Sequence, residues 1–239
     1  MLSNFYASRK CFPYVICISF LLLCLAVAFS TDKEEAVFAS YPVKSVKTIV
    51  LDAGHGGEDC GAIGKNGVFE KDLNLLITKE LGRQLSELGY EVLYTRKEDH
   101  LLYKEEENIK GLRKIYDLKN RVKFASEKEN AIFVSIHMNA FSDEKYSGLQ
   151  VFFSKNHEQS RALANAVQLQ VKEKIQPENR RSIKEGTGMY LMENLYCPAI
   201  LIECGFLSNA EECEKLCEKE YQNKLCFSIL CGIISIMEE

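Results

Sequence analysis

The chain has 239 residues, of which 46% are hydrophobic, so it is long enough to bury the core of one globular domain. Its formal net charge is −4, and the sequence contains no long run of Lys and Arg. We therefore expect no nucleic-acid partner, because binding to a phosphate backbone requires clustered positive charge.

The N-terminal segment, residues 1–30, has the pattern of a signal peptide or signal anchor. Arg9 and Lys10 precede YVICISFLLLCLAVAF, an uncharged run that is short for a membrane span of about 20 residues. Small residues near its end suit a cleavage site. Cleavage and membrane anchoring both remain open, and a buried core helix is the weaker alternative. We expect the protein to work outside the cytoplasm, with this segment at the membrane.

The rest of the chain divides into a polar linker, residues 31–46, and one domain, residues 47–239. Seven of the ten cysteines lie in that domain. Seven is an odd number, no CxxC pair occurs, and the domain is too large to need a disulfide framework. We expect mostly free thiols, which indicates a reducing or anaerobic habitat.

Apolar runs alternate with amphipathic stretches along the domain. The run KTIVLDAG predicts a first strand, and apolar residues at helical spacing from Glu70 to Gly89 predict a helix. The segment YEVLYTR predicts a second strand, and KEDHLLYKEEENIKG predicts a charged, solvated loop. A second helix is expected to begin at Asp117.

The second half continues the alternation. Strands are predicted for AIFVSIH, GLQVFF and PAILIECGF, and a helix is predicted from about Glu158 to Lys174. QPENRRSIKEGTG predicts a loop. Asn209 and Glu212 have capping-box spacing before the helices that end the chain. This order predicts an α/β fold, a single domain with a twisted, largely parallel central sheet flanked by helices on both faces.

Ionisable residues follow three of the predicted strands. His55, His137 and Glu203 are expected at the carboxyl ends of strands, where ligands bind in open α/β sheets. Glu70 opens the helix after the glycine-rich loop, so it can face the same crevice. Two histidines and one glutamate suit a catalytic zinc, and the remaining glutamate suits a general base. Purely structural roles are the alternative for each residue taken alone.

The glycine-rich loop GHGGEDCGAIG also permits comparison with phosphate-binding loops. It has no GK[ST] sequence and no GxGxxG spacing, and Asp59 stands where a phosphate would approach. We therefore expect its glycines to allow tight turns and close approach of the backbone to a metal or substrate.

Four blocks together resemble the zinc-dependent N-acetylmuramoyl-L-alanine amidases of the amidase-3 family. They are IVLDAGHGGEDCGAIG, EKDLNLLITKELGRQLSELGYEVLYTR, SIHMNA and ILIECGFLSN. The resemblance implies that His55, Glu70 and His137 bind one zinc ion and that Glu203 is the catalytic glutamate. It also implies hydrolysis of the amide between N-acetylmuramic acid and L-alanine in peptidoglycan.

The single domain behind a membrane segment is similar to the germination-specific amidases of spore-forming bacteria, as are GLRKIYDLKNRV and GFLSNAEE. This similarity implies a role in spore cortex maturation towards muramic-δ-lactam, in the forespore intermembrane space. Alternatives are a vegetative amidase for cell separation or autolysis, a zinc carboxypeptidase or deacetylase, and a catalytically silent peptidoglycan-binding module. Family amidases are often restrained by an inserted helix, which the charged loop does not obviously form, so an activating or regulatory protein is expected.

Three further residues are candidates for substrate binding. Asn139 follows His137 by two residues, and the guanidinium groups of Arg121 and Arg181 suit substrate carboxylates. Solvation at the surface is the alternative role for each arginine.

Overall fold

The computed structural model describes residues 48–237, so the expected targeting segment and the whole of the expected linker lie outside the described residues. Among residues 48–237, no helix has the length and apolar character needed to cross a membrane.

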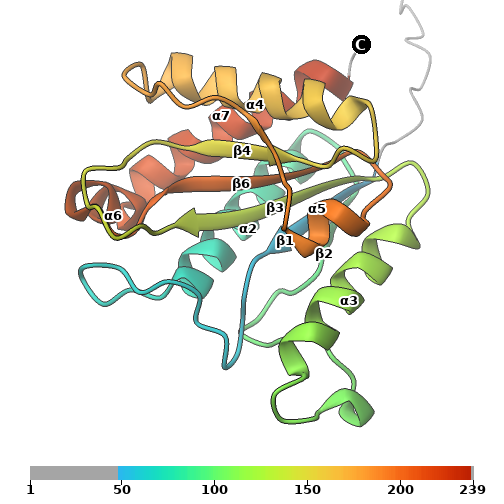
Figure 1. The fold of residues 1–239 in the computed structure, drawn as a ribbon. Helices are drawn as coiled ribbons and strands as arrows, with labels where there is room; N and C mark the ends of the chain where they lie inside the picture. The colour runs from blue at the N-terminus through green and yellow to red at the C-terminus, as the bar shows by residue number, and fades with distance from the viewer. Residues whose placement is uncertain (1–47, 238–239) are drawn as a thin grey trace, which may run out of the picture. The chain divides into compact units, whose positions relative to one another are not determined.

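A six-stranded sheet forms the centre of the domain (Figure 1). Its strands are, in sheet order, β2 (Val92–Tyr94), β1 (Ile49–Ala53), β3 (Ile132–Asn139), β6 (Ala199–Phe206), β4 (Gln150–Phe153) and β5 (Lys184–Glu185). Strands β2, β1, β3 and β6 run parallel, whereas β4 runs antiparallel to β6. The predicted largely parallel α/β sheet is therefore confirmed.

Helices cover both faces of this sheet. The helices are α2 (Glu70–Glu87), α3 (Arg113–Ser126), α4 (Gln159–Lys174), α5 (Tyr190–Asn194), α6 (Ala210–Cys217) and α7 (Lys219–Met237), with a 3-10 turn at Glu105–Glu107. The buried residues of α2, α4 and α7 join the larger hydrophobic core on one face. Helices α3 and α5 contribute to a smaller core on the other face.

Side-chain alternation explains why one face is more polar than the other. On β3, Ile132, Val134 and Ile136 point into the larger core, whereas Ser135 and His137 alternate with them. Strand β6 follows the same rule, since Ile202 points into the larger core and Glu203 does not. Polar side chains thus lie on the face of α3 and α5, towards the carboxyl ends of the strands.

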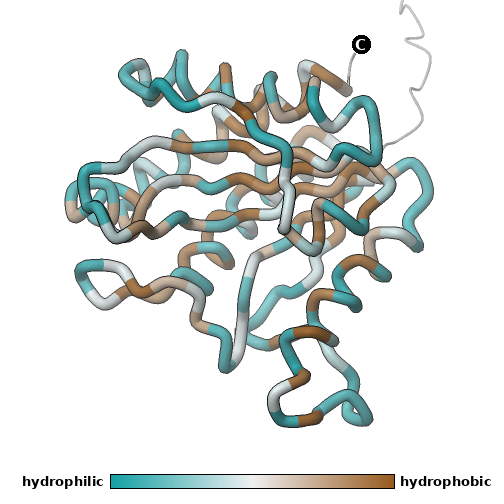
Figure 2. Tube along the Cα trace, viewed as in Figure 1, coloured by the Kyte–Doolittle hydropathy of each residue, from teal (hydrophilic) through white to brown (hydrophobic). Residues whose placement is uncertain are grey.

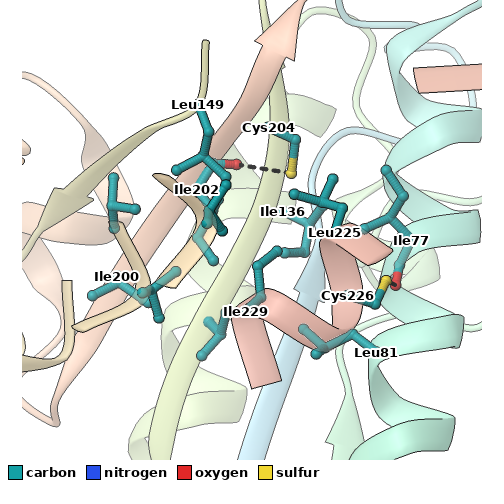
Figure 3. Close-up of a cluster of buried hydrophobic side chains, with 14 of the residues drawn as sticks. Ile77, Leu81, Ile136, Leu149, Ile200, Ile202, Cys204, Leu225, Cys226 and Ile229 are labelled. Carbon is teal, nitrogen blue, oxygen red and sulfur yellow. Dashed lines mark hydrogen bonds between the residues drawn. The ribbon is translucent and has the colours of Figure 1, made fainter. Parts of the chain in front are cut away.

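The larger core is apolar and includes cysteines (Figure 3). Cys204 and Cys226 are fully buried there, and each thiol lies within hydrogen-bond range of a main-chain carbonyl. Figure 2 shows hydrophobic residues concentrated along the central strands and hydrophilic residues along the loops. The seven cysteines between residues 48 and 237 are all unpaired in the structure.

Several local predictions were incomplete or wrong. Helix α3 begins at Arg113, four residues before the predicted start at Asp117. Strand β5 lies in a segment predicted as a loop, and α5 was not predicted. The cap of α6 is confirmed in part: the side chain of Asn209 accepts a hydrogen bond from the Glu212 amide. The Glu212 carboxylate instead accepts from the amides of Gly148 and Phe206, which links the segment before β4 to the end of β6.

Candidate metal centre and active site

His55, Glu70 and His137 converge at the carboxyl ends of β1 and β3. His55 follows β1 by two residues, His137 lies near the end of β3, and Glu70 is the first residue of α2. One ligand atom from each lies within 4.8 Å of the others. The three residues that the sequence singled out as possible metal ligands are therefore brought to one point.

The Glu70 carboxylate lies between the two imidazoles. Its Oε1 atom is 3.2 Å from Nε2 of His55 and 3.0 Å from Nδ1 of His137. A tetrahedral zinc with bonds of about 2.0–2.1 Å separates its ligand atoms by about 3.3 Å. The chemistry and spacing of these donors therefore fit a zinc ion, and three protein ligands leave a fourth position for water.

Main-chain and side-chain donors fix Glu70 in place. Its Oε2 atom accepts a hydrogen bond of 2.8 Å from the Ala62 amide, and its Oε1 atom accepts one of 3.1 Å from the Met138 amide. The amide group of Asn74, one turn along α2, also donates to Oε1. Although burial opposes ionisation, hydrogen bonds from His137 and His55 hold the pKa of Glu70 well below its usual range.

A second carboxylate orients His55. Nδ1 of His55 is 2.9 Å from Asp59, so Nε2 faces Glu70 and the centre. Burial alone lowers the pKa of His55, but Asp59 and Glu70 together raise it to about 9. A carboxylate on the far nitrogen of a metal-binding imidazole fixes its orientation and increases its basicity. Lys114 also pairs with Asp59, at 2.9 Å.

Two glycines provide the space that this packing requires. A Cβ atom on Gly54 would lie 2.2 Å from the His137 ring. A Cβ atom on Gly61 would lie 2.5 Å from Oε2 of Glu70 and 2.8 Å from the His55 ring. These two glycines let the side chains of the candidate ligands approach the backbone closely, and the expected approach to a metal or substrate stays a prediction.

Glu203 lies beside His137 in the sheet. The two residues are register partners on the parallel strands β3 and β6, so their side chains lie on the same face. The Oε2 atom of Glu203 is buried and has no hydrogen-bond partner among the described residues. Burial raises the pKa of this carboxyl group to about 7, and the nearby charge of Glu70 adds to the rise while His137 opposes it. Its pKa is therefore close to that of an effective general base at neutral pH.

The structure separates the three candidate substrate-binding residues. Asn139 lies at the end of β3, half-buried, and its role stays a prediction. Arg181 is half-buried: it bonds Gln150 at 2.6 Å and lies 4.8 Å above the Phe206 ring. It also lines a pocket of about 1000 Å³ that none of the metal-ligand candidates lines.

Arg121 is placed where substrate cannot reach it. Its side chain is 1% exposed, and its guanidinium group pairs with Asp52 at 2.6 Å and Asp117 at 2.8 Å. The predicted role in binding substrate is wrong for Arg121 because its donors are used inside the protein. The spacing of Asp117 and Arg121, four residues apart on one helix, was a signal for an ion pair between them but not for its burial.

Two other residues around the centre were not assigned a role from the sequence. Asp59 could have been assigned, since a carboxylate four residues after a candidate ligand histidine is a natural partner for its second nitrogen. Arg96 gave no such signal, because its contacts are to main-chain oxygens distant in sequence, among them Ala53 and Lys71.

Comparison with known proteins gives a family match over nearly the whole described domain. The model of a family described as N-acetylmuramoyl-L-alanine amidase, amidase-3, matches residues 49–235. The germination-specific N-acetylmuramoyl-L-alanine amidase of Bacillus subtilis is 37% identical over 195 residues, which cover 82% of this chain and 81% of that protein. The N-acetylmuramoyl-L-alanine amidase LytC of the same organism is 29% identical over 79% of this chain and 35% of its own length.

Solved structures show the same fold. The CwlD amidase of Clostridioides difficile, solved in complex with the GerS lipoprotein, is 41% identical and superposes with a TM-score of 0.77, covering 80% of this chain and 98% of that one. An N-acetylmuramoyl-L-alanine amidase from Clostridium difficile 630 is 31% identical, with a TM-score of 0.71 and coverage of 81% and 98%.

Proposed function

This chain belongs to the amidase-3 family of N-acetylmuramoyl-L-alanine amidases and is a peptidoglycan amidase, and we propose that it depends on zinc and acts on spore cortex. The observation that supports zinc dependence most directly is the convergence of His55, Glu70 and His137 within 4.8 Å beside Glu203, whose Oε2 atom is buried. We propose these three as the zinc ligands and Glu203 as the catalytic residue.

Zinc, when bound, would polarise the scissile carbonyl and lower the pKa of a bound water to about 7. The protein's own contribution is the placement of its ligands and of one proton acceptor. Asp59 keeps Nδ1 of His55 occupied, so that Nε2 is available to the centre. The amides of Ala62 and Met138 keep Glu70 in a single orientation.

Glu203 would move the proton during hydrolysis. As a carboxylate it takes a proton from the attacking water while the water oxygen bonds to the carbonyl carbon of the lactyl group. It then gives that proton to the alanine nitrogen as the carbon–nitrogen bond breaks, so the carboxylate is regenerated. A pKa raised to about 7 by burial suits a group that must both accept and return a proton.

The proposed substrate is cortex peptidoglycan. Support comes from the 37% identity to the Bacillus subtilis relative, whose name describes it as germination-specific. Removal of the stem peptide from muramic acid would precede formation of muramic-δ-lactam. Because peptidoglycan lies outside the cytoplasm, we also propose an extracytoplasmic site of action, membrane-bound or released according to the fate of residues 1–30.

A regulatory partner is also proposed. One of the relatives of known structure was solved in complex with a lipoprotein. In this chain, residues 97–112 contain only a 3-10 turn, Glu105–Glu107, and no helix that could act as a built-in inhibitor. We propose that an extracytoplasmic lipoprotein controls the activity of this chain.

A comparison of substrates tests the proposed role. The full-length chain, purified in mild detergent and loaded with zinc, is incubated separately with cortex-type and vegetative peptidoglycan, with and without a candidate lipoprotein. Mass spectrometry then measures the stem peptides that begin with L-alanine. Faster release from cortex supports the cortex role, whereas equal or faster release from vegetative walls supports the alternative of a cell-separation or autolytic amidase.

A further inference from the structure

Arg96 and Arg121 contact the segment that carries His55. We propose that these two buried arginines are positioning residues for His55: they bind the three successive carbonyl groups from the last residue of β1 to His55 and so fix the backbone conformation in which the imidazole faces Glu70. This inference rests on the proposed zinc dependence of the site.

The backbone at His55 is in a conformation that needs support. His55 has a φ of 62°, and only one other non-glycine residue among positions 48–237, Asn130, has a positive φ. A residue with a Cβ atom is disfavoured in this left-handed region. In the neighbouring extended regions the imidazole would point elsewhere, so the orientation of this proposed ligand depends on whatever holds the turn.

The two arginines donate hydrogen bonds to the main-chain carbonyl groups of Ala53, Gly54 and His55. The Ala53 oxygen accepts from Nη1 of Arg121 at 2.7 Å and from Nε of Arg96 at 2.9 Å. The Gly54 oxygen accepts from Nη2 of Arg96 at 3.0 Å, and the His55 oxygen accepts from Nη2 of Arg121 at 2.7 Å. Each of three successive residues therefore has its carbonyl fixed by a guanidinium group.

Arg96 also connects this turn to the helix that carries Glu70. Its Nη2 atom donates to the Lys71 oxygen at 2.8 Å, one residue beyond Glu70. Asn74, which donates to both Gly54 and Glu70, makes a second connection between the same two segments. The contacts of Arg96 thus fix the relative position of two of the three proposed zinc ligands.

Burial and charge balance show that the pair is a built feature. Arg96 and Arg121 are 2% and 1% exposed. Arg121 pairs with the buried carboxylates of Asp52 and Asp117, whereas the donors of Arg96 bond main-chain oxygens. Hydroxyl groups of Thr95 and Ser135 complete the partners of Asp52. Arginine suits this role because its planar fork offers five donors in fixed directions, whereas lysine is a point charge on a flexible stem.

The test compares zinc affinity with folding stability in the full-length chain. Arg121→Lys keeps the positive charge beside Asp52 and Asp117 but loses the fork that reaches the Ala53 and His55 oxygens. Zinc affinity is measured by competition with a chromophoric chelator, and stability by thermal unfolding without metal. Arg83→Lys is the matched control, because Arg83 is exposed on α2 and its ion pairs within residues 48–237 are with Glu80 and Glu87.

We expect Arg121→Lys to bind zinc about 10- to 100-fold more weakly than the wild type while still unfolding cooperatively, as for other residues that orient metal ligands. The control should keep wild-type affinity. A folded Arg121→Lys chain with wild-type zinc affinity would overturn the inference. If the wild-type chain itself bound no zinc, the proposed zinc dependence would fail together with it.

Arg96→Lys is the second variant if Arg121→Lys does not fold. It leaves Arg121 paired with both carboxylates and removes the contacts to Gly54 and Lys71. A loss of zinc affinity of about 10-fold or more in a folded Arg96→Lys chain supports the inference, and unchanged affinity overturns it. If neither variant folds even with saturating zinc, the pair serves the fold as a whole, and the inference is overturned.

Discussion

Replacement of Gly54 by alanine tests how tightly the proposed metal site is packed. The new Cβ atom would lie 2.2 Å from both Cε1 and Nε2 of His137, about 1.2 Å short of the 3.4 Å at which ordinary contact begins. Gly54 does not have a positive φ, so alanine adds no backbone strain at this position. The substitution therefore acts on the His137 ring.

The expected loss follows from how little a metal site tolerates. Ligand distances at a zinc ion are defined to about 0.2 Å, whereas relief of this clash requires the His137 ring or the β1 backbone to move about 1 Å. A misplacement of about 1 Å can cost a factor of about 100 in rate. We expect Gly54→Ala to lower kcat/KM at least about 100-fold and zinc affinity about 10- to 100-fold.

Zinc competition, stem-peptide release and thermal unfolding measure the three consequences. Gly89→Ala is the matched control, because Gly89 follows α2 with a φ of 86° and no atom within 4 Å of its would-be Cβ. That control should lose about 1 kcal/mol of stability and keep wild-type zinc affinity. A folded Gly54→Ala chain that binds zinc as tightly as the wild type would refute the packing argument.

Three further predictions concern the proton acceptor and the orientation of one ligand. Glu203→Gln should keep wild-type zinc affinity and lose about 10²- to 10⁴-fold in kcat, because the amide cannot accept the water proton; full activity in a stem-release assay would remove Glu203 from the mechanism. Asp59→Asn should weaken zinc binding about 10- to 100-fold in the chelator competition, since His55 loses the carboxylate on Nδ1, and unchanged affinity would contradict that role. In zinc-free protein, ¹³C NMR should show the Glu203 carboxyl group protonated at low pH and ionising with a pKa near 7. Added zinc should lower that pKa, because a nearby cation favours the carboxylate. A pKa near 4.5 without zinc would contradict the argument that burial raises it.

The central features of the fold could be predicted from local pattern. Buried parallel strands are nearly continuous apolar runs, which is why AIFVSIH and PAILIECGF were identified as strands. The alternation of strands and amphipathic helices then placed His55, His137 and Glu203 at one edge of the sheet. The register of β3 and β6, which sets His137 directly beside Glu203, appears only in the structure.

Contacts between distant segments account for what the sequence did not show. Strand β5 has only two residues and pairs with β4 from within a polar segment, so no periodicity marked it. Arg121 looks like a surface arginine in sequence, because one of its two buried carboxylate partners, Asp52, lies 69 positions away. Its contacts place it beneath the His55 turn, where it supports the site without contact to substrate.

Release of stem peptides by the full-length chain, with and without zinc, tests whether His55, Glu70 and His137 form a zinc site that catalysis requires. The purified protein is assayed on peptidoglycan after zinc loading, after chelation, and after zinc is restored, with mass spectrometry of the fragments and metal analysis of each sample. We expect one zinc ion per chain, release of peptides that begin with L-alanine, loss of release on chelation and recovery with zinc. Release of L-alanine peptides that persists in metal-free protein would contradict the proposed role of His55, Glu70 and His137.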